Sequence, residues 1–155
     1  MGRKDSRKRM SRIARTVVRN QRFLGTDIRR DPSRSLAEIQ ADQGKGELNQ
    51  ALAFTALRDA AHKPFWFKEI RRATPIEDEE RKIDIVVTTT DVGELYIQIK
   101  SSGFRARKFL HWQANQVTED SRRMIVVVVH RGETRPALGA RILGQLEMLH
   151  AQLIS

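Results

Sequence analysis

The chain has 155 residues, with 29 Lys and Arg against 19 Asp and Glu, a formal net charge of +10 at pH 7, and no cysteine. The length fits one domain with its own hydrophobic core, and the lack of cysteine excludes a disulfide scaffold, a thiol nucleophile and a zinc-finger or iron–sulfur site. No apolar run reaches the ~20 residues of a membrane span and no signal-peptide core follows the N-terminus, so we expect no membrane insertion and a cytoplasmic or nucleoid location.

Most of the positive charge lies in residues 1–34, which hold 12 Lys and Arg and three Asp and so carry +9 of the net charge. We predict that this segment is a basic arm, disordered when free, because its like charges repel and its apolar stripe is narrow. Its arginines at helical spacing are Arg12, Arg15, Arg19 and Arg22. Each can neutralise a nucleic-acid phosphate and release counterions. An organelle-targeting segment, a nuclear-import or membrane-surface segment and plain solubilising charge are the alternatives.

Residues 35–155 are nearly neutral and contain the elements of a single domain. A helix is predicted from Gly44 to His62, ended by Pro64. Its apolar and small residues lie on most sides, so we expect it to be largely buried. An aromatic-rich first strand follows at 65–70, and the acidic run 77–80 is predicted as a loop.

Two stretches rich in β-branched and apolar residues predict a β-hairpin. The first is 83–90, and the second is the alternating segment 95–100. Between them, 90–93 carries the Asp and Gly of a turn.

The C-terminal part of the chain predicts a helix at 105–120, a strand at 124–129 and a last helix that begins near Pro136. The strand is continuously apolar, a pattern typical of a central strand covered on both faces. One face of the last helix carries Leu138, Ile142, Leu146, Leu149 and Leu153. The order α-β-β-β-α-β-α predicts an α/β domain with a mixed central sheet flanked by helices.

Three polar residues interrupt the apolar strands of the predicted hairpin: Asp84, Gln98 and Lys100. Because side chains alternate along a strand, Asp84 points to the other face of its strand from Ile83 and Ile85. The same alternation places Gln98 and Lys100 together on one face of their strand. If all three point the same way, they bring a carboxylate, a carbonyl oxygen and a cation to one site. Such oxygens suit Mg²⁺ or Mn²⁺. A salt bridge between Asp84 and Lys100 is the simpler alternative.

This pattern resembles the PD-(D/E)xK nuclease superfamily, which has the restriction-endonuclease-like fold. The resemblance lies in the order of elements and in Asp84, thirteen intervening residues, and Gln98-Ile99-Lys100. Glu47 on the first predicted helix matches the helical glutamate of that family, although a negative charge in a first helical turn is also favourable by itself. The stretch 98–102 looks most like archaeal-type Holliday-junction resolvases. The resemblance covers about residues 42–130.

The resemblance implies metal-dependent hydrolysis of a DNA backbone, with branched DNA as the preferred substrate. Asp84 would be the main metal ligand, Glu47 would bind the metal through water, and Gln98 would present its side-chain oxygen. Lys100 would serve the attacking water, and metal and lysine would stabilise charge on the phosphate. These four residues are the predicted catalytic residues.

Two departures from the family pattern stand out. Ile83 replaces a proline, which is a mild change. Gln98 stands where the family usually has Glu or Asp, and because an amide brings no charge, metal affinity should fall. Glu69 or Glu94 could lend the missing carboxylate, but nothing in the sequence places either of them.

Further residues beside the hairpin are candidates for nucleic-acid contact. They are Ser101, Arg105, Arg107 and Lys108. A solvated helix face explains the three basic residues nearly as well. Gln113 is predicted as a core amide. The four histidines, His62, His111, His130 and His150, show no ligand spacing and are predicted not to bind metal.

Two functions of different class follow from the sequence. The first is a Mg²⁺- or Mn²⁺-dependent DNA endonuclease, expected to be a homodimer because cutting two strands needs two symmetric sites. The second is a nuclease-fold protein that only binds nucleic acid, such as a ribonucleoprotein component. RNA is an alternative partner in both.

Overall fold

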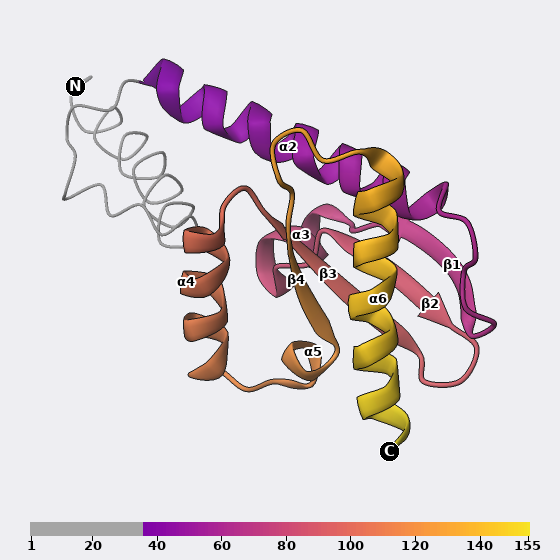
Figure 1. The fold of residues 1–155 in the computed structure, drawn as a ribbon. Helices are drawn as coiled ribbons and strands as arrows, with labels where there is room; N and C mark the ends of the chain where they lie inside the picture. The colour runs from indigo at the N-terminus through magenta and orange to yellow at the C-terminus, as the bar shows by residue number, and fades with distance from the viewer. Residues whose placement is uncertain (1–35) are drawn as a thin grey trace. The chain divides into compact units, whose positions relative to one another are not determined.

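The structure, a computed structural model, describes the backbone of residues 36–155 and the side chains of residues 44–155. In chain order its elements are α2 (Leu36–Arg58), β1 (Phe67–Arg72), α3 (Pro75–Arg81), β2 (Ile85–Thr89), β3 (Glu94–Lys100), α4 (Gly103–Ala114), α5 (Glu119–Arg122), β4 (Met124–Val128) and α6 (Arg135–Ile154) (Figure 1). The predicted α/β class with a mixed sheet and flanking helices is confirmed. Within the described residues, no helix is both long and apolar enough to span a bilayer.

The four strands form one sheet in the order β1-β2-β3-β4. The predicted hairpin is confirmed: β2 and β3 are antiparallel, with Ile85 opposite Ile97 and Val87 opposite Leu95. β1 is antiparallel to β2, whereas β4 is parallel to β3. The first strand begins at Phe67 rather than at the exposed Phe65.

The prediction of a central position for the last strand is wrong, because β4 is an edge strand of this sheet. The other part of that prediction, helices covering the strand, is confirmed, since both α4 and α6 contact β4. Most of its residues are half-buried, and Val127 is fully buried. A continuously apolar strand therefore indicates that both of its faces are covered by helices, and it does not indicate how many strands pair with it.

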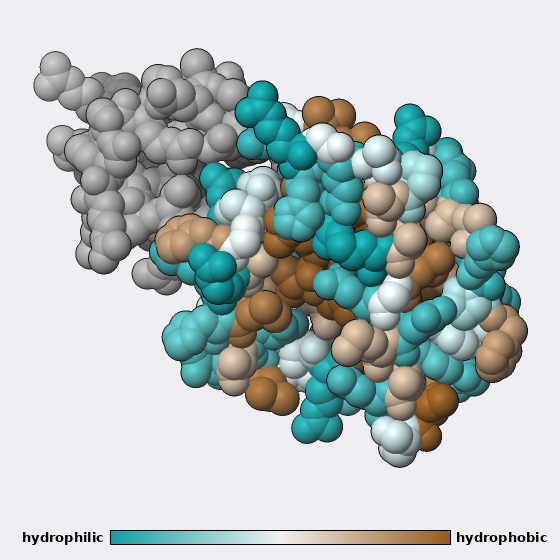
Figure 2. Space-filling view, viewed as in Figure 1, coloured by the Kyte–Doolittle hydropathy of each residue, from teal (hydrophilic) through white to brown (hydrophobic). Residues whose placement is uncertain are grey.

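The main core lies between the sheet and two helices, α2 and α6. It contains Ala53, Ala56 and Leu57 of α2, Leu138, Ile142, Leu143, Leu146 and Leu149 of α6, and Ile85, Val87, Leu95, Ile97, Ile99 and Val127 of the strands. The predicted apolar face of the last helix is thus confirmed, with Leu153 half-buried at its end. The space-filling view shows hydrophilic side chains over most of one face, with apolar side chains gathered between α4 and α6 (Figure 2).

Helix α2 differs from its prediction in extent and in burial. It runs from Leu36 to Arg58, so Gly44 and Gly46 lie inside the helix instead of opening it. Only one side is buried: Leu57 is fully buried, whereas Leu48 is 59% exposed. The helix packs against the core along a single stripe, which leaves its other apolar residues at the surface.

The acidic run predicted as a loop is the helix α3. Thr74 caps it, because its side chain accepts a hydrogen bond from the Glu77 N–H while the Glu77 side chain accepts one from the Thr74 N–H. Pro75 occupies the first turn, and acidic residues favour that end of a helix. These capping interactions outweigh the mutual repulsion of the carboxylates.

The predicted helix 105–120 is interrupted. α4 ends at Ala114, and the short α5 begins at Glu119 after a new cap by Thr118. The Thr118 side chain accepts a hydrogen bond from the Ser121 N–H. A local cap of this kind competes with continuation of the preceding helix.

Candidate active site

Asp84 lies immediately before β2, at the end of the hairpin opposite to the turn, and is 3% exposed. Its main-chain N–H donates to the Ile97 carbonyl at 2.9 Å. Its Oδ2 accepts the Ile99 N–H at 2.7 Å, and its Oδ1 accepts from Gln50 Nε2 of α2 at 3.0 Å. The carboxylate is thus held from the strand and from the helix. Each carboxylate oxygen keeps a second lone pair for another ligand.

Gln98 and Lys100 project from β3 on one face, as the period of two requires, and are 7% and 6% exposed. Within the described residues, Gln98 Oε1 is buried and has no hydrogen-bond partner. Lys100 Nζ lies 4.6 Å from the centre of the Phe109 ring of α4. Among the described residues, the Gln145 Oε1 of α6 is the other buried side-chain oxygen without a partner, and such atoms are uncommon in native proteins.

The environment of Asp84 and Lys100 moves both pKa values toward neutrality. Burial raises the pKa of Asp84 to about 7, while the Ile99 N–H opposes this rise and the charge of Asp78 reinforces it. Burial lowers the pKa of Lys100 to about 8, against the attraction of Asp84. The two groups therefore interact electrostatically across the hairpin.

Glu47 and Asp84 both line a pocket of about 680 Å³. α2 contributes Glu47 and Gln50 to its wall, and α3 contributes Asp78. Glu47 itself is exposed. Asp84 lines this pocket, whereas Gln98 and Lys100 do not.

The oxygen donors near this pocket suit a hard cation better than a soft one. Within the described residues, no group of three or more His, Asp or Glu side chains is arranged to hold a metal ion. What the described residues offer is the Asp84 carboxylate and Glu47, which line the same pocket, and the orphaned Gln98 oxygen, which does not line it. Mg²⁺ commonly takes one or two carboxylates and completes its shell with water and phosphate oxygens.

Comparison with known proteins gives no further guide. No family model, curated protein or solved structure matches this chain. The site must therefore be interpreted from its own side chains.

The predicted nucleic-acid contacts are dispersed around the start of α4. Ser101 is half-buried, and its Oγ accepts from Arg105 Nη1 at 3.0 Å. Arg107 and Lys108 are exposed, with Lys108 Nζ 4.9 Å from the centre of the Phe104 ring. The arm residues fall outside the described residues: Arg12, Arg15, Arg19 and Arg22.

Neither acidic substitute proposed for the missing carboxylate lies at the site. Glu69 is exposed on β1, in register with Thr88. Glu94 begins β3, at the turn end of the hairpin, and its Oε1 lies 3.6 Å from the Arg71 guanidinium. Both positions are separated from Asp84 by the length of a strand.

Gln113 contacts the sheet away from the site, because its Nε2 donates to the sulfur of Met124 at 3.5 Å. Of the four histidines, His150 is buried; its ring stacks on Trp66 and its Nε2 lies 2.9 Å from Asp91. His62, His111 and His130 are exposed.

Sequence reasoning missed two residues beside Asp84. Gln50 lies one helical turn after Glu47, a spacing that places both on one side of α2. Asp78 belongs to the acidic run that composition assigns to a solvated loop. Only the Thr74-to-Glu77 capping pattern could have shown that this run is a helix with a fixed face.

Proposed function

We propose that this chain is a metal-dependent nuclease that hydrolyses phosphodiester bonds of DNA, with Asp84, Gln98, Lys100 and Glu47 in its active site. The observation that carries the proposal is the buried polar group of Asp84, Gln98 and Lys100 at one end of a β-hairpin. Each is less than a tenth exposed. Burying a carboxylate, an amide and an ammonium beside a core is costly, so their placement argues for a chemical use.

Mg²⁺ or Mn²⁺ fits the donors on this side of the sheet. The orphaned Gln98 oxygen would gain a partner from a bound cation, and the Asp84 carboxylate, held by Ile99 and Gln50, would have lone pairs left to ligate it. Glu47, exposed at the same pocket, suits an indirect ligand that acts through water. A bound divalent cation supplies charge stabilisation for the phosphate and lowers the pKa of water.

Lys100 is suited to accept a proton from the attacking water. Its side chain is buried, and burial lowers its pKa to about 8, close to the range in which a lysine accepts a proton efficiently. In its charged form the same group counters charge on the phosphate. The Phe109 ring of α4 lies against the ammonium, with Nζ 4.6 Å from the ring centre.

The proposed substrate is DNA, and the preference for branched DNA follows from the resemblance to Holliday-junction resolvases. The basic residues of α4 begin directly beyond Lys100, where they can contact the backbone on either side of a cut. The basic arm adds affinity that is independent of sequence. A homodimer would present two such sites.

The second candidate is a protein of this fold that binds nucleic acid without cutting it. It is favoured by the amide at Gln98, where the family usually has a carboxylate, and by the lack of a three-carboxylate group among the described residues. Both features lower the expected metal affinity.

The test is cleavage of linear, single-stranded and four-way DNA in Mg²⁺, in Mn²⁺ and in EDTA. The proposal expects cutting with either metal, loss of cutting in Asp84→Asn and Lys100→Gln, and retained binding in both. Lys68→Gln, which removes an exposed charge on β1, is the matched control and should cut normally. If the wild-type protein binds these DNAs and leaves all of them intact in both metals, the nuclease assignment fails and the second candidate stands.

A further inference from the structure

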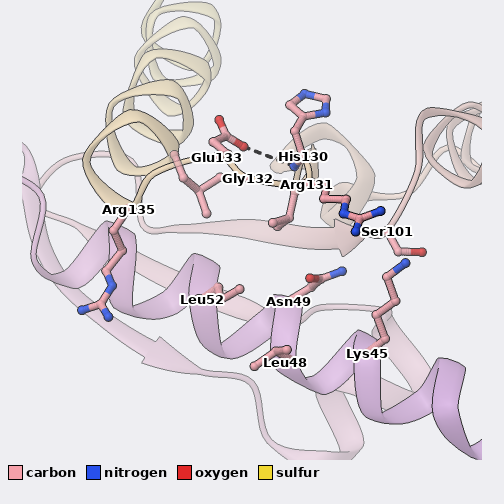
Figure 3. A pocket seen from close by; sticks show the side chains of 12 residues that line it. Lys45, Leu48, Asn49, Leu52, Ser101, His130, Arg131, Gly132, Glu133 and Arg135 are labelled. Carbon is pink, nitrogen blue, oxygen red and sulfur yellow. Dashed lines mark hydrogen bonds between the residues drawn. The ribbon is translucent and has the colours of Figure 1, made fainter.

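A second pocket, of about 630 Å³, lies beside the first. Leu48 of α2 lines both pockets and so separates them. Ser101 and Val129, which directly follow β3 and β4, also line the second pocket. Figure 3 shows Ser101 at one end of this pocket. Because these strands are parallel, both end at this edge of the sheet, and Ser101 is the residue after Lys100. The second pocket therefore begins next to the proposed active site.

The second pocket is positively charged. Lys45, Arg131 and Arg135 line it, against one acidic residue, Glu133. Glu133 is already neutralised, since Arg141 contacts its two carboxylate oxygens at 2.7 and 2.9 Å and holds the pKa of Glu133 below its usual value. Lys45 and Arg131 extend toward Ser101 at one end of the pocket (Figure 3). That end suits an anion such as a phosphate.

Asn49 gives the pocket a second chemical character. It is only 9% exposed, and its amide projects from α2 into the pocket (Figure 3). Among the described residues, no hydrogen bond to this side chain is present. Leu48 and Leu52, which line the same pocket, provide apolar surface that is 59% and 37% exposed. A ligand part that fits here is apolar on its faces and carries a donor and an acceptor at its edge.

A nucleobase has these properties, and an acyl chain or a bare phosphate does not. An amide side chain matches the donor and acceptor that adenine presents at its edge. The volume also lies within the roughly 300–1,000 Å³ of small-molecule sites. The charged end of the pocket matches a phosphate and the other end matches a base, so the two ends together suit one nucleotide.

We propose that the second pocket binds one nucleotide of the cleaved strand, with its phosphate at Lys45 and Arg131 and its base against Leu48, Leu52 and the Asn49 amide. This inference rests on the proposed function, because it places the nucleotide next to the phosphate that is cut. A free nucleoside monophosphate offers the same chemistry, so the experiment must separate the two sources.

The experiment measures binding to full-length protein carrying Asp84→Asn, in EDTA so that no strand is cut. The probes are dAMP, deoxyadenosine, inorganic phosphate and a short single-stranded oligodeoxyadenylate. Binding of each probe is measured by calorimetry and by changes in amide chemical shifts. We expect dAMP to shift the amide resonances of Asn49 and Ser101. We expect the oligonucleotide to bind more tightly than dAMP, and tighter binding of dAMP would overturn the assignment to a strand.

The variants separate the two ends of the pocket. Asn49→Leu should weaken dAMP binding about tenfold and leave phosphate binding unchanged. Lys45→Gln with Arg131→Gln should weaken both and flatten the dependence on salt. Lys68→Gln removes a lysine charge far from the pocket and should change neither. Lys45 and Arg131 are exposed, so their variants test the pocket even if Asn49→Leu unfolds the protein.

Cleavage by the wild-type protein, measured in parallel, distinguishes the two possible failures. If the pocket variants fold and bind dAMP and the oligonucleotide as their parent does, the nucleotide site is refuted even where the wild-type protein cuts DNA. If binding is lost in the variants but no DNA is cut under any condition, the pocket assignment stands and the nuclease proposal fails.

Discussion

The carboxylate of Asp84 takes the place of a main-chain acceptor for Ile99. Oδ2 accepts the Ile99 N–H at 2.7 Å, while the Asp84 N–H donates to the neighbouring carbonyl of Ile97. The side chain thereby extends the β2–β3 ladder by one hydrogen bond beyond the end of β2. Asp84 is therefore a structural residue as well as a proposed ligand, and a substitution that deletes its side chain tests both properties at once.

The first prediction separates these two properties. Asp84→Ala should lower the free energy of unfolding by about 1–3 kcal/mol, because it leaves the buried Ile99 N–H without an acceptor. Asp84→Asn keeps an oxygen for that N–H and should cost less, yet it should abolish metal-dependent cutting equally. Urea unfolding of both variants, followed by cleavage assays at the same temperature, checks this. Equal destabilisation by the two variants would show that the hydrogen bond contributes nothing.

The second prediction concerns the orphaned oxygen of Gln98. Gln98→Glu should lower the Mg²⁺ concentration needed for half-maximal cutting, because it adds a charged ligand beside Asp84. Without metal it should destabilise the fold, since two buried carboxylates repel each other. Metal titrations of cleavage and of thermal stability measure both effects. If added Mg²⁺ fails to restore the stability of Gln98→Glu, then Gln98 does not face a metal site.

The hairpin and its polar group could be predicted because their signals are local. The short turn between the two stretches fixes that they pair, and the period of two places Gln98 and Lys100 on one face. The edge position of β4 could not be predicted, since nothing within an apolar strand encodes its number of neighbours. The contact between Gln50 and Asp84 depends on the rotation of α2, which is set by the packing of Ala53 and Leu57 against the sheet.

The third prediction is a pH dependence of stability that arises outside the proposed active site. Arg71 holds Glu77 through two hydrogen bonds, at 2.7 and 3.0 Å, and these lower the pKa of Glu77 to about 2. Because the folded-state pKa lies below the unfolded value, the stabilisation is complete above about pH 4.5 and is lost as the pH falls toward 2. We expect a loss on the order of 2 kcal/mol across this window.

Urea unfolding between neutral and acidic pH checks this expectation. Glu77→Gln should be less stable than the wild type at neutral pH and should show a smaller decline on acidification. Glu79→Gln, which removes an exposed carboxylate from the same helix, is the matched control and should decline as the wild type does. Parallel curves for the wild type and Glu77→Gln would show that this ion pair does not couple to folding.

The last prediction uses two glycines of α6 whose surroundings differ. A Cβ on Gly139 would lie 2.5 Å from the Ala56 carbonyl oxygen of α2, whereas a Cβ on Gly144 would meet no atom within 4 Å. Gly139→Ala should therefore push α6 away from α2 and destabilise the protein by about 1–3 kcal/mol. Gly144→Ala should instead stabilise it by about 0.5–1 kcal/mol, since alanine is the better helix former at an exposed position.

Because α2 also carries Glu47 and Gln50, Gly139→Ala should slow DNA cutting at temperatures where it remains folded, while Gly144→Ala should leave the rate unchanged. Equal melting temperatures for the two variants would mean that the helices separate at no cost, and that α2 is not held against α6 by this contact.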